Sequence, residues 1–249
     1  MNDASVPVRT SSQLVLSGVD FAHDTRVVLS ALTLDISVTR LGVVGRNGSG
    51  KTTLARLLAG LVAPTAGELR LNGVDVARDR RAALSEVGIL FQNPDHQIIF
   101  PTVLEELAFG LIQQGQKKAA AEDAARDVLA RFNKTHWQEA YINTLSHGQK
   151  HLVCLMAIVA MAPRLLILDE PFAGLDMVTR AQLTRYLDHY TGNLIHITHD
   201  PADLAGYDSA LWLDRGALRQ IGPAEEVVPA YVARMTELGA ADDIADLPG

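Results

Sequence analysis

The fold of this chain is decided by the stretch Gly45-Arg46-Asn47-Gly48-Ser49-Gly50-Lys51-Thr52, which fits G-x-x-x-x-G-K-[ST] at every fixed position. The apolar run Leu41-Gly42-Val43-Val44 precedes it and predicts a short buried strand. Residues 53–60 follow it and predict a helix that ends at a glycine. The stretch therefore lies between a strand and a helix, which is the context that a phosphate-binding loop requires.

The chemistry of this loop favours a phosphate chain as its ligand. Glycines let the backbone approach an anion closely, successive N–H groups form a cradle, and the start of the following helix adds partial positive charge. We expect Lys51 to reach the β- and γ-phosphates of a nucleotide and the Thr52 hydroxyl to join the coordination of Mg²⁺. The alternative, a glycine-rich turn that binds nothing, is disfavoured by the Lys-Thr pair. The predicted nucleotide-binding residues are Gly45, Arg46, Asn47, Gly48, Ser49, Gly50, Lys51, Thr52 and Thr53.

The composition indicates a packed domain. Hydrophobic residues make up 48% of the 249 residues and charged residues 20%, which predicts one large α/β domain over residues 1–249. The formal net charge of -7 argues against sequence-independent nucleic-acid binding, which needs a basic face. A single cysteine, Cys154, excludes a disulfide within the chain and favours a reducing compartment. Residues 1–12 show no signal-peptide pattern, and no apolar run is long enough to predict a membrane span.

Two acidic residues follow a second buried strand. Leu165-Leu166-Ile167-Leu168 is a continuous apolar run typical of a core parallel strand, and Asp169 and Glu170 come directly after it. Because ligands of open α/β sheets bind beyond the carboxyl ends of the strands, both carboxylates should lie beside the phosphate loop. We expect Asp169 to hold Mg²⁺ and Glu170 to accept a proton from an attacking water.

Two further strand ends carry candidate site residues. The run Val87-Gly88-Ile89-Leu90-Phe91 leads into Gln92, whose side-chain oxygen could ligate Mg²⁺ or orient water. A strand that begins at Asn193 ends in His199, which could hydrogen-bond a γ-phosphate. His196 lies in the middle of that strand and is expected to pack in the core.

The remaining segments predict a helical insert and a tail. Helical periodicity without a strand signal predicts a helical subdomain at about residues 100–160, inserted in the α/β core. Ser146 is a good N-cap for a helix that runs to Ala162. The tail at about residues 231–249 is acidic and is expected to be loosely held.

Two aromatic side chains ahead of the phosphate loop could stack on a nucleotide base. His23 is the candidate by position and Phe21 is the second choice, since any flat π-face can serve. The alternative is that Phe21 belongs to the core and His23 is merely exposed.

The ordered set of these motifs resembles the nucleotide-binding subunit of ATP-binding-cassette (ABC) transporters from Leu14 to about Val228. The resemblance implies a P-loop NTPase fold with a RecA-like, mostly parallel α/β core, an N-terminal antiparallel β-subdomain and an inserted helical subdomain. It also identifies a glutamine loop at Gln92, a signature loop at Leu145-Ser146-His147-Gly148-Gln149, an aspartate turn at Gly174-Leu175-Asp176 and a switch histidine at His199.

The resemblance further implies a head-to-tail dimer with two ATP molecules and Mg²⁺ at its interface, near Asp176. Ser146, His147, Gly148 and Gln149 would meet the γ-phosphate held by the other subunit. Lys51, Glu170 and His199 would be catalytic, and Thr52, Gln92 and Asp169 would hold the metal. Closure of the dimer would move a membrane partner, which implies a peripheral protein at the cytoplasmic face of the inner membrane.

Three positions depart from the family pattern. His147 stands where the usual signature has glycine, and its Cβ and imidazole either restrict a close approach or add a phosphate donor. Lys150 is followed by His151 rather than by the usual basic continuation, and His23 replaces the usual tyrosine that stacks on adenine.

The stretch Gln92-Asn93-Pro94-Asp95-His96-Gln97 resembles the energy-coupling-factor group of vitamin and metal-ion importers. In that group this region contacts a transmembrane scaffold subunit, which works with a substrate-binding membrane subunit, so Asp95, His96 and Gln97 are the expected contacts. Residues 145–150 with 153–156 resemble biotin-uptake ATPases first and cobalt or nickel ATPases second. A homodimer is favoured over pairing with a paralogue.

Two other functional classes remain open. A soluble ABC ATPase of DNA repair or translation is disfavoured, because the chain shows no long coiled-coil insertion, no second cassette and no basic balance. A regulatory ATP binder without turnover is disfavoured by Glu170 and His199, although His147 leaves room for it.

Overall fold

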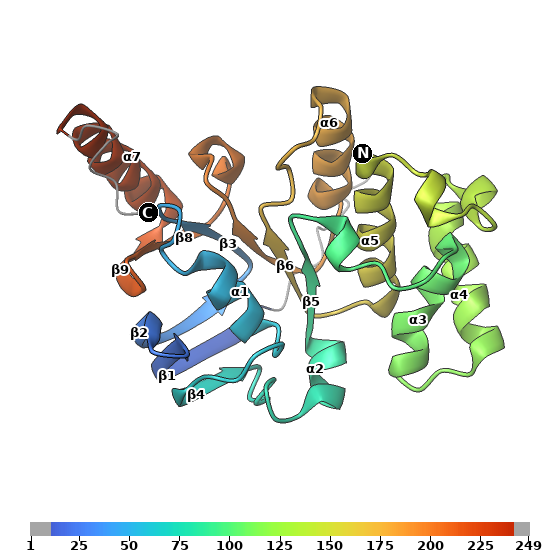
Figure 1. Ribbon diagram of the computed structural model, residues 1–249, viewed down its shortest axis with the longest axis horizontal. Coiled ribbons are helices and arrows are strands. Elements are labelled where there is room, and N and C mark those ends of the chain that lie inside the picture. The colour runs from blue at the N-terminus through green and yellow to red at the C-terminus, as the bar shows by residue number, and fades with distance from the viewer. Residues whose placement is uncertain (1–10, 242–249) are drawn as a thin grey trace, which may run out of the picture.

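The computed structural model of the protein describes residues 11–241, which form two β-sheets with helices packed around them (Figure 1). Within these residues the larger sheet has six strands in the order β5-β6-β7-β3-β8-β9. Neighbours from β5 to β8 are parallel, and β9 is antiparallel to β8. The fold class predicted from the sequence is confirmed. The strands are β3 (Arg40–Val44), β5 (Val87–Leu90), β6 (Leu165–Asp169), β7 (Asn193–Ile197), β8 (Ser209–Asp214) and β9 (Ala217–Pro223).

The larger sheet is covered on both faces, so its central strands are apolar throughout. In β6, Leu165 and Ile167 pack in the core that includes α1 (Lys51–Leu58). Leu166 and Leu168, which point the other way, pack in the core that includes α5 (His147–Met161) and α6 (Met177–Asp188). The helix after the phosphate loop and the helix after Ser146 therefore lie on opposite faces of one sheet.

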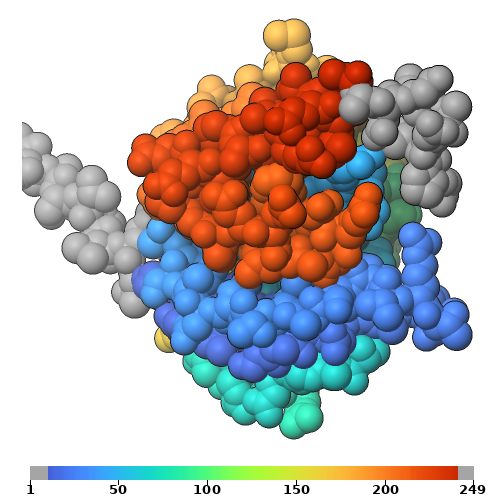
Figure 2. All heavy atoms as spheres, turned by 90° about the vertical axis from the view of Figure 1, so that its left-hand side faces the viewer, coloured from blue at the N-terminus to red at the C-terminus, as the bar shows by residue number. Residues whose placement is uncertain are grey.

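The N-terminal strands form the predicted antiparallel sheet, with the order β2-β1-β4. Its strands are β1 (Ser12–His23), β2 (Arg26–Val38) and β4 (Ala66–Leu71). Gly18 has a φ of 57° at a shift of register, so β1 bends there without ending. Ser30 N donates to the carbonyl oxygen of Gly216 at 2.9 Å. Figure 2 shows the C-terminal segment stacked on this N-terminal layer.

The helices that come between β5 and β6 in the sequence lie together at one end of the molecule (Figure 1). They are α3 (Val103–Gln113), α4 (Lys118–Arg131) and α5, with the short helices η2 (Thr135–Trp137) and η3 (Ile142–Thr144) before α5. A Cβ at Gly110 would lie 2.3 Å from Met161 Sδ, so this glycine lets α3 approach α5 closely. The remaining short elements are α2 (Arg80–Glu86), η1 (Pro94–His96) and η4 (Pro201–Leu204).

The C-terminal segment differs from the loosely held tail that the sequence predicted. Residues 231–241 belong to α7 (Ala224–Ala241), and the rest of that predicted tail lies outside the described residues. Tyr231 is buried, and its ring packs edge-on against Trp212 with centroids 5.6 Å apart. The aromatic contact was invisible in the acidic composition of the tail, and it anchors α7 on the sheet.

The register of the parallel strands aligns their carboxyl ends. Val43 of β3 lies opposite Ile197 of β7, and Ile197 also lies opposite Asp169 of β6. Leu90 of β5 lies opposite Leu168 of β6. The loops that follow these four strands therefore leave the sheet at one edge.

We expect Tyr231→Ala to lower the free energy of unfolding by about 3 kcal/mol, because it removes a buried aromatic side chain and leaves a cavity beside Trp212. Urea denaturation would measure the change. The neighbouring substitution Val232→Ala is the control, since Val232 is 42% exposed and its loss should cost no more than about 0.5 kcal/mol. Equal stabilities of the two variants would show that α7 is not part of the cooperative fold.

Candidate functional site

The phosphate loop, residues 45–52, joins β3 to α1. Gly50 caps α1 with a φ of 99°, a conformation that favours glycine. A Cβ at Gly45 would lie 2.3 Å from the carbonyl oxygen of Leu213, so only glycine fits there. The Ser49 hydroxyl is buried and has no hydrogen-bond partner among the described residues. A buried donor without a partner, in a loop shaped by glycines, fits an anionic ligand.

Lys51 lies across the loop rather than in solvent. Its side chain is buried, and Nζ donates to the carbonyl oxygens of Gly45 at 2.7 Å and Arg46 at 3.2 Å. Burial lowers the pKa of Lys51, while the charges of Glu170 and Asp169 oppose that shift. The loop thus holds a cation against backbone carbonyls, where phosphate oxygens can compete for it.

Asp169 ends β6 beside the first turn of α1. Thr52 Oγ1 donates to Asp169 Oδ1 at 3.3 Å, which joins the phosphate loop to the acidic strand. Burial raises the pKa of Asp169, and the Thr52 hydrogen bond opposes the rise. Among the described residues no group of three His, Cys, Asp or Glu side chains could hold a metal by itself. A hydroxyl and one carboxylate fit Mg²⁺, which binds through few protein ligands together with phosphate oxygens.

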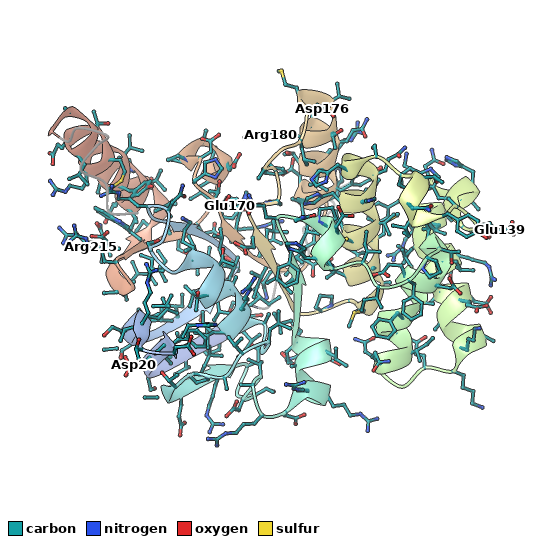
Figure 3. All side chains as sticks on the ribbon, viewed as in Figure 1. Asp20, Glu139, Glu170, Asp176, Arg180 and Arg215 are labelled. Atoms are coloured by element: carbon teal, nitrogen blue, oxygen red, sulfur yellow. The ribbon has the colours of Figure 1, made fainter. Side chains whose placement is uncertain are left out.

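Glu170 and His199 meet at the next step along the edge. Glu170 has a φ of 51°, unusual for a residue with a side chain, and its N–H donates to the carbonyl oxygen of Ile197 at 2.9 Å. Its Oε2 lies 3.2 Å from His199 Nδ1. Figure 3 shows Glu170 near the middle of the molecule, beside α6. The strained backbone turns the carboxylate towards the histidine at the end of the neighbouring strand.

Gln92 lies two residues after β5, and its side chain is exposed. The register places the end of β5 beside the end of β6, so Gln92 and Asp169 leave the sheet at the same edge. His196 is buried in β7, as expected for a histidine in the middle of a strand.

The helix after the predicted signature loop begins with a capping box. Ser146 Oγ accepts from Gln149 N at 3.3 Å, and Gln149 Oε1 accepts from Ser146 N at 2.8 Å. Ser146 is exposed. The start of α5 therefore lies at the surface of the protein.

Gly148 and His147 have different environments in that loop. A Cβ at Gly148 would lie 2.4 Å from Thr179 Cγ2 of α6, so a glycine is required for α5 to pack on α6. His147, which departs from the family pattern, is exposed and needs no such approach within its own protomer. Asp176 caps α6 and binds Thr179 Oγ1 at 2.7 Å, so the signature loop touches the aspartate turn through Thr179.

Comparison with known families identifies the chain. A family model described as ABC transporter matches residues 29–173. The chain belongs to this family. The resemblance inferred from the sequence is thereby confirmed, and the protein is an ATPase of the ABC type.

Named relatives cover most of this ABC ATPase. The biotin transport ATP-binding protein BioM of Rhodobacter capsulatus is 47% identical over 91% of this chain and 99% of its own. The energy-coupling factor transporter ATP-binding protein EcfA1 of Latilactobacillus sakei is 30% identical over 88% of this chain and 80% of its own. The structure of cbiO1 from Clostridium perfringens, described as part of the ABC transporter complex cbiONQ, matches with a TM-score of 0.71 at 25% identity. That match covers 92% of this chain and 95% of the other.

None of the helices in residues 11–241 combines the length and the apolar character that crossing a bilayer requires.

His23 and Phe21 are separated by the fold of β1. Phe21 packs against the core, whereas the His23 side chain is 79% exposed and lies 3.2 Å from Asp24. Of the two aromatic candidates His23 is the more exposed, and it forms no hydrogen bond with the phosphate loop among the described residues.

The predicted partner-contact residues form the short helix η1 and its end. Asp95 Oδ1 accepts from Lys150 Nζ of α5 at 2.7 Å, and this hydrogen bond lowers the pKa of Asp95. Gln97 Oε1 accepts from Phe91 N at 3.3 Å, while His96 is exposed. The loop after Gln92 is thus attached to the signature helix.

Sequence reasoning missed three residues that hold these loops in place. Lys150 binds Asp95, and the buried Glu106 accepts from Ile99 N at 2.9 Å and Phe100 N at 2.8 Å. The third is Arg180 of α6, which binds Asp200 and Asp203 after the switch histidine. No local spacing in the sequence signals these three contacts.

Two buried histidines make stability depend on pH. Burial lowers the pKa of His151 in α5 and of His196 in β7 to about 4. The unfolded chain therefore binds two protons near pH 5 that the folded chain does not, and stability present above pH ~6.5 is lost as the pH falls through ~4.

We expect His151→Phe to make this loss less steep by up to about 1.4 kcal/mol per pH unit, because one titrating group is removed. Neither ring nitrogen of His151 forms a hydrogen bond of ordinary geometry among the described residues, so stability at pH 7 should change little. Urea midpoints between pH 4 and pH 7 would measure the slope. The exposed His136→Phe is the control, and an unchanged slope in His151→Phe would contradict a neutral buried His151.

We expect Gly148→Ala to lower ATP turnover and stability, because its new Cβ would displace Thr179 and the aspartate turn. The double variant Gly148→Ala/Thr179→Ser should recover both, since serine lacks the methyl group but keeps the hydroxyl that binds Asp176. Steady-state turnover and urea denaturation of the four proteins in this cycle are the measurements. Failure of Thr179→Ser to rescue would show that the close contact is not the cause.

Proposed function

We propose that this ABC ATPase is the motor subunit of an energy-coupling-factor importer, and that its cargo is a vitamin, with biotin favoured. The observation that carries the motor role is the 3.2 Å contact between Glu170 and His199 at the sheet edge where the phosphate loop also lies. The choice of importer is supported by the relatives named for biotin transport and for the energy-coupling factor. The extent of the first match, 91% of this chain, supports biotin.

The proposed nucleotide site combines residues 45–53 with His23 as the base-stacking residue. Lys51 would exchange its two backbone carbonyl partners for oxygens of the β- and γ-phosphates. Bound Mg²⁺ would neutralise charge on the phosphates, and Thr52, Gln92 and Asp169 are its proposed protein ligands.

Glu170 and His199 are the proposed catalytic pair, with Lys51. Glu170 is the proposed acceptor of a proton from the attacking water. Its contact with His199 Nδ1 orients the imidazole. Because Nδ1 faces Glu170, Nε2 is the ring nitrogen of His199 that is proposed to serve the γ-phosphate.

A second copy of the chain is proposed to complete the site. Helices α1 and α5 pack on opposite faces of the sheet, and Ser146 is exposed, so the start of α5 is suited to a γ-phosphate held by another protomer. Residues 145–149 and Asp176 would form that dimer interface. Closure on ATP would then be a conformational step that does work on partner subunits.

The partners we propose are a transmembrane scaffold subunit and a substrate-binding membrane subunit, at the cytoplasmic face of the inner membrane. Asp95, His96 and Gln97 are the proposed contact residues. The Asp95–Lys150 hydrogen bond gives this surface a direct connection to the signature helix. A force on η1 would thereby reach Ser146.

We expect Glu170→Gln to lower ATP turnover at least about 100-fold, because a general base contributes roughly 10²–10⁴-fold. ATP affinity should stay within about 3-fold of the parent value, since Lys51 and the loop are intact. Phosphate release and equilibrium nucleotide binding are the measurements. Glu68→Gln, an exposed carboxylate of β4, is the control. Turnover of Glu170→Gln at the parent rate would remove Glu170 from the mechanism.

The cargo is tested in proteoliposomes that contain the chain with its membrane subunits. ATP-dependent accumulation of labelled biotin that is lost in Glu170→Gln supports the proposal. Accumulation of Co²⁺ or Ni²⁺ without biotin would replace the vitamin by a metal ion. Binding of the chain to DNA or RNA at physiological ionic strength, without uptake of any of these, would favour a role in DNA repair or translation.

A further inference from the structure

Arg180 lies one helical turn beyond the aspartate turn and is hydrogen-bonded to it through its backbone. Asp176 Oδ1 accepts from the N–H groups of Val178 and Thr179, both at 2.9 Å. Arg180 N in turn donates to the carbonyl oxygen of Asp176 at 2.9 Å. Figure 3 shows both residues on α6. The backbone of Arg180 is therefore fixed relative to the proposed dimer contact.

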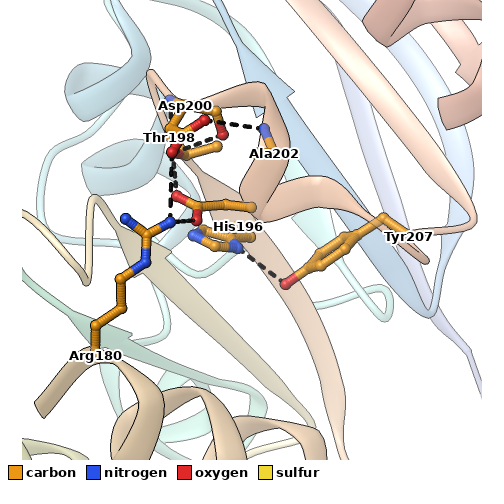
Figure 4. Close-up of polar contacts among 7 residues, drawn as sticks. Arg180, His196, Thr198, Asp200, Ala202 and Tyr207 are labelled. Atoms are coloured by element: carbon orange, nitrogen blue, oxygen red, sulfur yellow. Dashed lines mark hydrogen bonds and ion pairs between the residues drawn. The ribbon is translucent and has the colours of Figure 1, made fainter. Parts of the chain in front are cut away.

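The guanidinium of Arg180 binds the segment that carries His199. It lies 3.4 Å from Asp200 Oδ2 and forms a second, closer ion pair with Asp203 Oδ1 (Figure 4). The Asp203 side chain is only 7% exposed. Because a carboxylate in that environment needs a charged partner, Arg180 is the group that makes its burial tolerable.

Hydrogen bonds fix the backbone on both sides of His199. Thr198 Oγ1 donates to Asp203 Oδ2 at 2.8 Å, and Asp200 N donates to Thr198 Oγ1 at 3.0 Å. Asp200 Oδ1 accepts from Ala202 N at 3.0 Å (Figure 4). His199 thus lies between Thr198 and Asp200, which belong to one hydrogen-bonded network. Arg180 supplies the positive charge of that network.

Arg180 also touches the segment that carries Glu170. Its guanidinium lies 5.2 Å from the centroid of the Phe172 ring, two residues after Glu170. Phe172 also contacts the buried His196, whose ring is edge-on at 5.5 Å and whose Nδ1 lies 3.0 Å from the Tyr207 hydroxyl. One side chain therefore contacts both segments whose residues form the Glu170–His199 pair.

We propose that Arg180 is a positioning residue that holds His199 against Glu170. The inference rests on the proposed function, because it takes Glu170 and His199 as the catalytic pair. Arg180 itself does not touch the nucleotide. Its effect is on the rate of turnover, through the 3.2 Å contact between the other two side chains.

The first test compares Arg180→Met with Arg180→Lys. We expect Arg180→Met to lower kcat about 10- to 100-fold with KM for ATP within about 2-fold, because misplaced catalytic groups slow chemistry while the phosphate loop stays intact. Lysine should restore part of kcat, since it can bind one carboxylate but not two in a fixed geometry. Arg185→Met, on the exposed face of the same helix, is the control. If Arg180→Met instead raised KM for ATP about 10- to 100-fold and left kcat unchanged, the proposal would be overturned.

The second test separates positioning from a general structural role. In a His199→Ala background, Arg180→Met should lower kcat by less than about 2-fold further, because the group that it positions is gone. If kcat of the double variant fell by the product of the two single effects, Arg180 would act independently of His199 and the inference would be overturned. If Asp203 without its partner prevents folding, the variant Arg180→Met/Asp203→Asn removes that charge and is compared with Asp203→Asn alone.

The outcomes distinguish the two levels of the proposal. Parent turnover in His199→Ala would refute the catalytic role of the pair and, with it, the basis of this inference. Loss of turnover in His199→Ala together with parent kcat in Arg180→Met would refute only the role of Arg180. Three results together would support the positioning role of Arg180. Turnover falls in both His199→Ala and Arg180→Met, Arg180→Lys restores part of kcat, and the double variant loses no more than His199→Ala alone.

Discussion

The parallel pairing of β6 with β7 is the constraint on which the site depends. It sets Asp169 opposite Ile197 and lets Glu170 N donate to the carbonyl oxygen of Ile197. A shift of one residue would turn every side chain of β6 to the other face and move its acidic end away from His199. The apolar residues on both faces of β6 prevent that shift, because each of them has a place in one of two cores.

The same edge of the sheet holds ionisable side chains in buried positions. Burial lowers the pKa of Lys51 and raises that of Asp169, so the fold holds both groups in surroundings that disfavour their ionised forms. Glu170 adds a backbone conformation that favours glycine. A rigid sheet between two apolar cores can maintain this arrangement, which would offer the proposed nucleotide fixed charges and donors.

The loops around the site are attached to one another by side-chain contacts that lie outside the sheet. Lys150 connects the signature helix to η1, Thr179 connects Gly148 to Asp176, and Arg180 connects α6 to the segment around His199. These contacts join the start of α5, the aspartate turn and the switch segment into one linked layer above the strand ends. Side-chain contacts therefore connect the proposed dimer interface and the proposed partner surface to the segments that carry Glu170 and His199.

The sequence by itself determined the phosphate loop, the acidic strand, the signature helix with its Ser146 cap and the family, because each of these depends on local spacing of residue types. It also separated His196 from His199, although the strand that it expected to end in His199 ends at Ile197 and leaves His199 in the following loop. Only the tertiary structure decided that Tyr231 anchors α7 and that Gly148 packs on Thr179. The roles of Lys150, Glu106 and Arg180 likewise emerged only there. The partner of Lys150, Asp95, lies far away in the sequence. The contacts of Glu106 and Arg180 depend on how a helix approaches a loop, and no local sequence pattern encodes that approach.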